Sequence, residues 1–349
     1  MKILVIQQKM IGDVLATSVT FESLRKKYPS AKLHYLIHSN TIPVIENNKN
    51  IDKIIEIKPN IQKGLFGLLV QIKIVRNERY DIIIDSYSKI QTALICKFSG
   101  ANKTISFYKS YSRFFYNNTV IRKNKSISIA TKAVEHRLQL LEPLGIPFEV
   151  IKPKIYVKEE ETNKVKKRLI ENEIDLNKPI VMISALGSNL SKTYPLEYLA
   201  IIIDEIAKNG NNQILFNYIP NQKSEVEKLY LMCSKKTQNN IFINFHASSL
   251  REFISITSQC SALIGNEGGA TNIAKALNIP SFTIFSPFIE KNSWNMFENE
   301  TTNISVHISD YNSTLFSKKN HKYEDVYLLF KPELFIRKLI FFLENNNLK

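Results

Sequence analysis

The sequence predicts an α/β fold of two doubly wound domains with a cleft between them. Short apolar strands alternate with helical patterns over residues 2–144, and a second alternating series runs over residues 180–288. Such alternation is typical of parallel strands joined by right-handed crossovers. Pro153 and a charged segment at 158–167 separate the two series. The 349 residues, 44% of them hydrophobic, suffice for two separate cores.

The first series begins with a buried strand at residue 2 and ends with a helix that stops before a glycine. We expect strands at 2–6, 32–37, 53–57, 80–85 and 104–107, and helices at 11–28, 41–47, 67–77, 88–98 and 130–144. In the helix at 11–28, apolar Val14, Leu15, Val19 and Leu24 recur at helical spacing. Gly145 ends the last of these helices.

The second series repeats the pattern and is followed by a polar, irregular stretch at 310–323. We expect strands at 180–184, 212–217, 241–244, 261–264 and 281–285, and helices at 195–209, 221–232, 250–260, 270–277 and 332–345. The first series predicts one domain and the second series another, and the last helix follows the polar stretch.

The bulk composition indicates a cytoplasmic protein. The three cysteines are scattered, which argues against disulfides and zinc. The chain shows no signal-peptide layout and no apolar run of about 18 residues, so we expect no membrane-spanning segment.

A strongly basic segment lies between Lys97 and Arg137, where nine Lys or Arg residues face one acidic residue, Glu135, in a chain of net charge +15. Aromatic residues are interleaved with these cations, at Tyr108, Tyr111, Phe114, Phe115 and Tyr116. An anionic glycolipid or membrane surface, a nucleic acid, and a merely solvated face all fit this composition. We favour the anionic lipid, and expect no nucleic acid, with a contact face formed by Lys103, Lys109, Arg113, Arg122 and Lys123.

A glycine-rich turn at 265–269 joins an apolar strand to a helix and suits a phosphate. At the carboxyl end of a parallel strand, the amides and positive dipole of the next helix collect beside the ligand. Gly268 and Gly269 remove Cβ atoms where a ligand would approach the backbone. A tight βα turn alone would also explain the two glycines, and the turn is neither a Walker loop nor a G-x-G-x-x-G fingerprint.

Two other loops carry candidate chemistry at strand ends. Asp13 lies in the first turn of a helix, where it either complements the helix dipole or serves as a general base facing the cleft. Lys192 follows Gly187 and Ser188, where it either holds a diphosphate or is one more surface lysine. The chain lacks D-x-D, H-E-x-x-H, G-x-S-x-G and C-x-x-C motifs, so we expect no bound metal.

Together these loops resemble the family 9 glycosyltransferases, the ADP-heptose:lipopolysaccharide heptosyltransferase family. Residues 3–6 with 11–15 are similar to the family's opening strand and I-G-D turn, and Gly187-Ser188 with residues 192–195 to its G-[AS]…K-R-W-P segment. Residues 266–269, 273–277 and 285–287 resemble its N-D-[ST]-G…A-x-A-L…F-G-P segment. The chain departs from these motifs at Gln7, Tyr194, Glu267, Gly268 and Asn272, where the family has Arg, Trp, Asp, a hydroxyl residue and His.

The resemblance implies a GT-B fold of two facing Rossmann-like domains. Residues 1–160 would bind the acceptor, residues 175–325 the nucleotide-sugar, and the terminal helix at 332–348 would cross back to the first domain. It implies a metal-independent, inverting transfer with no cofactor, in which Asp13 is the base and Lys192 stabilises the departing phosphates. The implied donor residues are Gly187, Ser188, Thr193, Glu267, Gly268, Gly269, Ala270 and Thr271.

The implied reaction moves a sugar, heptose in the family, from an ADP-heptose-like donor to a lipopolysaccharide core or related surface glycan. The implied acceptor is an anionic glycolipid, with peripheral contact at the cytoplasmic face of the inner membrane. Two alternatives stay open: a nucleotide-sugar epimerase-like enzyme, and a non-catalytic binder of anionic polymer that keeps the fold.

Overall fold

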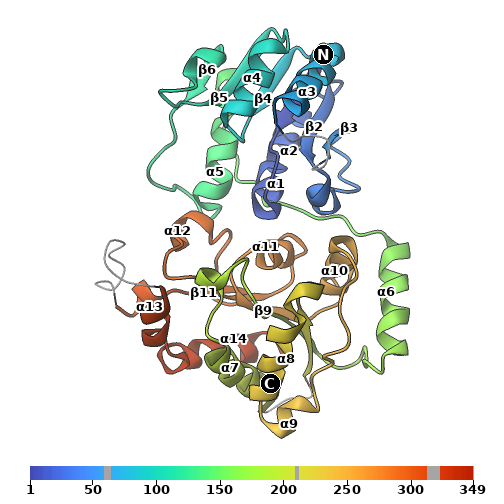
Figure 1. The fold of residues 1–349 in the computed structure, drawn as a ribbon, viewed down its shortest axis with the longest axis vertical. Helices are drawn as coiled ribbons and strands as arrows, with labels where there is room; N and C mark the ends of the chain where they lie inside the picture. Colours follow the sequence, from blue (N-terminus) through green and yellow to red (C-terminus); the bar gives the residue numbers. More distant parts are fainter. Residues whose placement is uncertain (59–63, 209–211, 313–322, 349) are drawn as a thin grey trace. The chain divides into compact units, whose positions relative to one another are not determined.

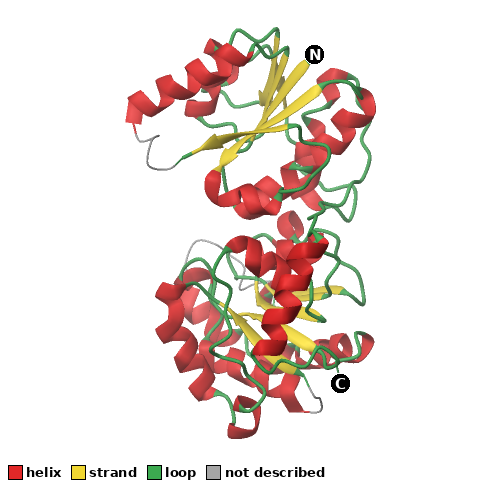
Figure 2. Cartoon of the chain, turned by 90° about the vertical axis from the view of Figure 1, so that its right-hand side faces the viewer, coloured by secondary structure: helices red, strands yellow, loops and turns green. Residues whose placement is uncertain are grey.

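The computed structural model describes residues 1–58, 64–208, 212–312 and 323–348, and the chain forms two compact units. Unit 1 contains Met1–Tyr156 together with Asn292–Met296, and unit 2 contains Val157–Lys291 and Phe297–Lys349. Each unit is a parallel sheet covered by helices (Figure 1, Figure 2). The predicted fold class, two α/β domains with parallel sheets, is confirmed.

The described residues of unit 1 form a six-stranded sheet in the order β3-β2-β1-β4-β5-β6, with every neighbouring pair parallel. Its strands are β1 (Lys2–Ile6), β2 (Lys32–His38), β3 (Lys53–Ile57), β4 (Ile82–Asp85), β5 (Lys103–Phe107) and β6 (Asn118–Val120). The central strand β1 is a continuous apolar run because both of its faces are covered.

Helices cover both faces of this sheet. They are α1 (Ile11–Thr17), α2 (Val19–Lys27), α3 (Gly64–Glu78), α4 (Ile90–Phe98) and α5 (Thr131–Gln139). Successive side chains of a strand point to opposite faces. Tyr35 of β2 therefore packs on Phe21 of α2, with ring centroids 4.8 Å apart, whereas Leu36 joins the core cluster under α3 and α4.

The expected helix at 11–28 is two helices, because the chain breaks at Ser18. The Ser18 hydroxyl donates to the carbonyl of Leu15 at 2.7 Å, a local bond that competes with the helical pattern. The short strand β6 and the separate 3-10 turn at Glu142–Leu144 also differ from the expected elements.

The described residues of unit 2 form a five-stranded parallel sheet in the order β11-β10-β9-β7-β8. Its strands are β7 (Ile180–Ser184), β8 (Gln213–Asn217), β9 (Ala262–Asn266), β10 (Ser281–Ile284) and β11 (Asn303–Val306). Its helices are α6 (Glu159–Glu171), α7 (Leu196–Lys208), α8 (Lys223–Met232), α9 (Lys235–Gln238), α10 (Leu250–Thr257), α11 (Gly269–Ala276), α13 (Tyr323–Leu329) and α14 (Ile336–Asn345). The short helix α12 (Lys291–Trp294) lies mostly within the residues assigned to unit 1.

The boundaries of unit 2 differ from the expected ones. The charged segment after Pro153 is helix α6, and Arg251 Nε lies 2.6 Å from Glu161 Oε1, so that an ion pair ties α6 to α10. The expected strand at 241–244 is reduced to one bridge between Ile214 and Ile241. The polar stretch expected at 310–323 lies largely outside the described residues.

The terminal helix, which we expected to cross back to the first domain, belongs to unit 2. In α14, Leu339, Phe342 and Leu343 are buried in the core of unit 2, and the rings of Phe282 and Phe342 lie 5.7 Å apart. The apolar stripe of α14 therefore completes the second core. Within the described parts of the chain, no helix is both long and apolar enough to cross a bilayer.

Candidate active site

The carboxylate of Asp13 lies at the carboxyl edge of the sheet in unit 1. Strand β1 ends at Ile6 and α1 begins at Ile11, which places Asp13 in the first turn of that helix. Its Oδ1 pairs with Nη2 of Arg137, while Oδ2 lies 3.5 Å from the amide nitrogen of Met10. The second contact is long for a hydrogen bond, so Oδ2 retains capacity to accept a proton.

Arg137 reaches Asp13 from α5 and is held from three sides. Its Nη1 donates to the carbonyl of Ala133 at 2.7 Å, and its guanidinium lies 5.7 Å from the ring centroid of Trp294. Only 12% of the Arg137 side chain is exposed, and its Nε has no hydrogen-bond partner among the described residues. A cation held in this way fixes the orientation of the Asp13 carboxylate. Sequence reasoning missed both Arg137 and Trp294.

A second cation lies close to this pair. The Arg122 guanidinium packs 3.8 Å from the ring centroid of Phe107. Burial, and then the charge of Arg137, lower the pKa of Arg122. The site thus holds a second guanidinium group close enough to Arg137 for the two charges to interact, and such a pair of cations attracts an anion.

The neighbouring carboxylate, Asp85, has a structural role instead. Asp85 lies opposite Ile6 in the register of β4 with β1 and is fully buried. Tyr116 donates to its Oδ2 at 2.7 Å and the amide of Ser88 to its Oδ1 at 2.8 Å. Burial raises the pKa of Asp85. Because both oxygens are occupied, Asp13 is the carboxylate available for chemistry at this edge.

The five residues of the expected basic face do not form one cluster. Lys109 donates to the carbonyl of Ser88 at 2.5 Å, and Arg113 packs 4.7 Å from the ring centroid of Phe114. Both lie in the segment that joins β5 to β6. Lys123 pairs with Glu142 at 3.1 Å. Lys103 begins β5 at the opposite edge of the sheet, where it donates to the carbonyl of Pro143.

In unit 2, the turn between β9 and α11 needs a glycine at position 265 and leaves open space beside Gly268. Gly265 has φ +129°, and a Cβ there would lie 2.5 Å from the carbonyl oxygen of Ser184. Gly268, with φ +153°, caps α11, and a Cβ there would meet nothing within 4 Å. Gly269, Ala270 and Thr271 then form the first turn of the helix, whose amides have no intrahelical carbonyl to bind. The turn therefore presents free donors beside open space.

The loop at 187–193 folds back on itself and brings Lys192 to this turn. The amide of Gly187 donates to Thr193 Oγ1 at 3.0 Å, and a Cβ on Gly187 would collide with the carbonyl of Lys192. Ser188 lies exposed within the loop. Lys192 Nζ lies 3.3 Å from Glu267 Oε1, so the structure brings together two of the predicted site residues.

Asn266 connects these segments and was not among the predicted site residues. Its Oδ1 accepts the amide of Tyr194 at 2.7 Å, and its Nδ2 donates to the carbonyls of Ser184 and Ala185 at 2.9 Å each. The side chain is buried, at the last position of β9. An asparagine at a strand end just before a glycine turn was the one sequence signal of this role.

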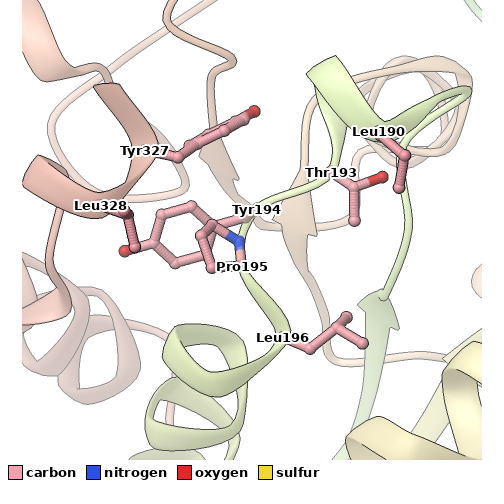
Figure 3. A pocket seen from close by; sticks show the side chains of 7 residues that line it. All are labelled: Leu190, Thr193, Tyr194, Pro195, Leu196, Tyr327 and Leu328. Atoms are coloured by element: carbon pink, nitrogen blue, oxygen red, sulfur yellow. The ribbon is translucent and has the colours of Figure 1, made fainter. Parts of the chain in front are cut away.

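An apolar pocket of about 320 Å³ adjoins the loop (Figure 3). Figure 3 shows Tyr327 and Leu328 of α13 at the left and Leu190, Thr193 and Leu196 at the right, with Tyr194 and Pro195 between them. Tyr194 donates to the carbonyl of Phe330 and is fully buried, so the residue that replaces the family's tryptophan is part of the core. Among the described residues, His, Cys, Asp and Glu form no group of three or more that could hold a metal ion.

Comparisons with known proteins agree with this architecture. The model of glycosyltransferase family 9 (heptosyltransferase) matches residues 70–324. Lipopolysaccharide heptosyltransferase 1 of Campylobacter coli is 25% identical over 294 residues, which are 82% of this chain and 84% of that protein. Lipopolysaccharide heptosyltransferase 3 of Escherichia coli is 22% identical over 78% of this chain and 80% of its own length.

Two solved structures share the fold over almost the whole chain. A glycosyl transferase of family 9 from Veillonella parvula superposes with a TM-score of 0.77 at 19% identity, covering 97% of both chains. ADP-heptose lps heptosyltransferase II of E. coli gives a TM-score of 0.70 at 15% identity, covering 97% of this chain and 99% of the other.

Proposed function

The chain belongs to glycosyltransferase family 9 and is a sugar transferase, and from this premise we propose that it transfers heptose from an ADP-heptose-like donor to an anionic lipopolysaccharide-type acceptor. The proposed transfer inverts the anomeric centre and uses no metal or cofactor. The single observation that carries the proposal is the pairing of Lys192 with Glu267 beside the open amides of α11. A cation and free amides at a helix N-terminus suit a diphosphate.

The proposed base is Asp13. Its Oδ2 takes the proton of the acceptor hydroxyl, and the hydroxyl oxygen attacks the anomeric carbon from the face opposite the diphosphate. The bond between the anomeric carbon and the phosphate oxygen breaks, and the nucleoside diphosphate leaves with the electron pair. Arg137 acts as a positioning residue, because it binds Oδ1 and leaves Oδ2 directed at the hydroxyl.

The departing phosphates gain negative charge as the bond breaks. Lys192 supplies a point charge, and the amides of Gly269, Ala270 and Thr271 supply oriented dipoles. Each such preorganised donor contributes about 3 kcal/mol to transition-state stabilisation in well-studied enzymes. Glu267 holds the lysine in place, and we propose that a donor hydroxyl shares this carboxylate when the sugar is bound.

The proposed acceptor carries negative charge near the reacting hydroxyl. The two guanidinium groups of Arg137 and Arg122 exceed the charge of Asp13, so the site attracts an anionic group. The nearby Lys109 and Arg113, which lie against exposed aromatic rings, extend this preference along the loop between β5 and β6. With such an acceptor, the proposed reaction takes place at the cytoplasmic face of a membrane.

A panel of nucleoside diphosphates and their sugars tests the proposal. A ligand that binds only the folded protein raises its melting temperature with occupancy. We expect ADP-heptose to give the largest shift, ADP a smaller one, and the Lys192→Ala variant to lose most of both. Donor consumption with a heptose-free lipopolysaccharide acceptor, followed by mass spectrometry, then reports transfer. Equal shifts for all sugars, or none, would contradict the proposed donor, and donor binding without transfer would contradict the proposed acceptor.

A further inference from the structure

The outer side of the two helices α3 and α4 carries an unusual combination of side chains. These helices contact each other and together cover one face of the sheet in unit 1, which buries Val75 and Cys96 in the core cluster beneath them. Figure 1 shows α3 and α4 side by side over β4. We call their solvent side the α3–α4 face.

Apolar side chains are exposed along this face. Leu65 and Phe66, in the first turn of α3, are 73% and 74% exposed. The other exposed apolar members are Leu69, Ile74, Ile90 and Phe98. The inner side of α3 is also apolar, so this helix is hydrophobic on both sides. A helix of that kind needs a second apolar environment besides its own core.

All the free charge on the face is positive. Residues 64–98 contain five cations, namely Lys73, Arg76, Arg79, Lys89 and Lys97, and each is exposed. None of the five forms an ion pair with another described residue.

The three carboxylates of the same segment are all engaged elsewhere. Glu78 pairs with Lys2 and Lys53, Asp81 accepts the amide of Lys2, and Asp85 is buried. The α3–α4 face therefore combines apolar side chains with unbalanced positive charge over a helix about 22 Å long.

We propose that the α3–α4 face docks on an anionic lipid surface, an inference that rests on the proposed glycolipid acceptor. Apolar side chains enter the boundary between headgroups and acyl chains, while lysine and arginine bind anionic headgroups. A second copy of the chain is a poorer occupant, because a two-fold interface would bring the five cations of each copy together. Single-stranded nucleic acid is also a poorer occupant, because four of the six exposed apolar side chains are aliphatic and offer no ring on which a base could stack.

The position of the face fits its proposed role. In a parallel sheet each crossover helix begins at the carboxyl edge, so the first turns of α3 and α4 lie at the edge that carries Asp13. Leu65 and Phe66 belong to the first turn of α3, and Ile90 opens α4. Docking through these residues brings lipid headgroups toward the carboxylate.

Vesicle sedimentation tests the proposal, with phosphatidylglycerol–phosphatidylcholine vesicles compared with pure phosphatidylcholine. We expect the full chain to bind the anionic vesicles and to dissociate at high salt. Two variants probe the face: Leu65→Ser/Phe66→Ser/Leu69→Ser, and Lys73→Gln/Arg76→Gln/Lys89→Gln/Lys97→Gln. Each should lower the partition coefficient about tenfold or more. The matched control, Lys164→Gln/Lys166→Gln/Lys228→Gln/Lys236→Gln in unit 2, removes the same charge and should bind nearly as wild type.

Donor binding, measured by melting temperature in the same variants, should be unchanged, which separates this inference from the proposed transfer reaction. The inference is overturned if the wild-type protein does not bind anionic vesicles. It is also overturned if the two variants of the α3–α4 face and the unit 2 control lose vesicle binding to the same extent. It is also overturned if sedimentation without lipid shows a dimer that the Leu65→Ser/Phe66→Ser/Leu69→Ser variant dissociates. Vesicle binding without any binding of the ADP-heptose-like donor would uphold the docking face and refute the proposed donor.

Discussion

Arg137 Nη2 donates to Asp13 Oδ1 across 124 residues of sequence, and this pair joins the first turn of α1 to the last turn of α5. Trp294 packs on the same guanidinium from a segment that lies still later in the chain. A carboxylate at a helix start is common, whereas this one has Oδ1 bound by a half-buried arginine and only a long contact, 3.5 Å from the Met10 amide, at Oδ2. The pairing therefore separates a candidate base from a simple helix-capping residue.

Replacing Asp13 or Arg137 should affect turnover more than donor binding. Asp13→Asn should lower kcat about 10²–10⁴-fold, the range contributed by a general base, with donor affinity nearly unchanged. Arg137→Gln should lower kcat about 10²-fold because the carboxylate loses its orientation, and Arg137→Lys should recover part of it. Arg337→Gln, an exposed cation in unit 2, is the control. An Arg137→Gln enzyme with wild-type kcat and a merely lower melting temperature would mean that Arg137 is structural.

Lys192 should act on donor binding and on the chemical step together. Lys192→Ala should weaken nucleotide-sugar binding and lower kcat, for a combined loss of about 10²–10³-fold, because a cation beside the departing phosphates is absent. Glu267→Gln, which keeps the shape but removes the charge partner of Lys192, should have a smaller effect. Isothermal titration and initial rates measure the two quantities, with Lys236→Ala as the surface control. Unchanged donor affinity in Lys192→Ala would exclude the phosphate role.

Asn266 should prove essential for the loop that carries Lys192. Asn266→Ala leaves the buried amide of Tyr194 without its partner, which should cost about 1–3 kcal/mol of unfolding free energy. Asn266→Asp should be worse, since a carboxylate oxygen then faces the carbonyls of Ser184 and Ala185. Urea unfolding measures the loss, with the exposed Asn163→Ala as control. Full stability in Asn266→Ala would show that the bonds contribute little.

Strand and helix alternation was sufficient to predict both parallel sheets, because apolar runs with period two or 3.6 reflect burial directly. The same patterns failed where contacts between segments distant in sequence determine the local structure. The charged helix α6 is stabilised by ion pairs to α10, which no local pattern reveals. Segment 241–244 has strand-like residues, yet its pairing with β8 is limited to one bridge, between Ile241 and Ile214. The sequence showed the apolar stripe of α14, but it did not show which of the two cores this stripe completes.

For the candidate site, motif positions located Asp13, Lys192 and the glycine turn, since these lie within one loop each. Sequence patterns did not identify Arg137, Trp294 or Asn266, because the contacts of these residues join segments far apart in sequence. The five basic residues illustrate the converse error. They are close in sequence, but Lys103 is the first residue of β5 and Lys109 follows its last residue, and a strand of five residues spans about 17 Å, so these two lie at opposite ends of the strand.

Chelation should leave the transfer rate intact. In the proposed reaction, Lys192 and the amides of α11 supply the positive charge that would otherwise have to come from a divalent cation. We expect the rate after EDTA treatment to stay within about twofold of the untreated rate, and added Mg²⁺ to have no further effect. Rates measured after dialysis, before and after metal addition, decide the point. A collapse with EDTA that Mg²⁺ restores would require a metal in the reaction.

Unit 1 should lose stability in acid partly through Glu78. Hydrogen bonds from Lys53 and then Lys2 lower the pKa of Glu78 to about 2, from its usual 4.5. A carboxylate whose pKa is lower in the folded state stabilises the fold above the unfolded value, and that contribution is lost as pH falls from 4.5 toward 2. Glu78→Gln should therefore destabilise unit 1 at neutral pH, and its deficit should shrink across this window. The single tryptophan, Trp294, lies in unit 1, so its fluorescence during urea unfolding reports this unit. Glu56→Gln, an exposed carboxylate of β3 without an ion pair to described residues, is the control, and a Glu78→Gln deficit that stayed constant from pH 7 to pH 2 would refute the assignment.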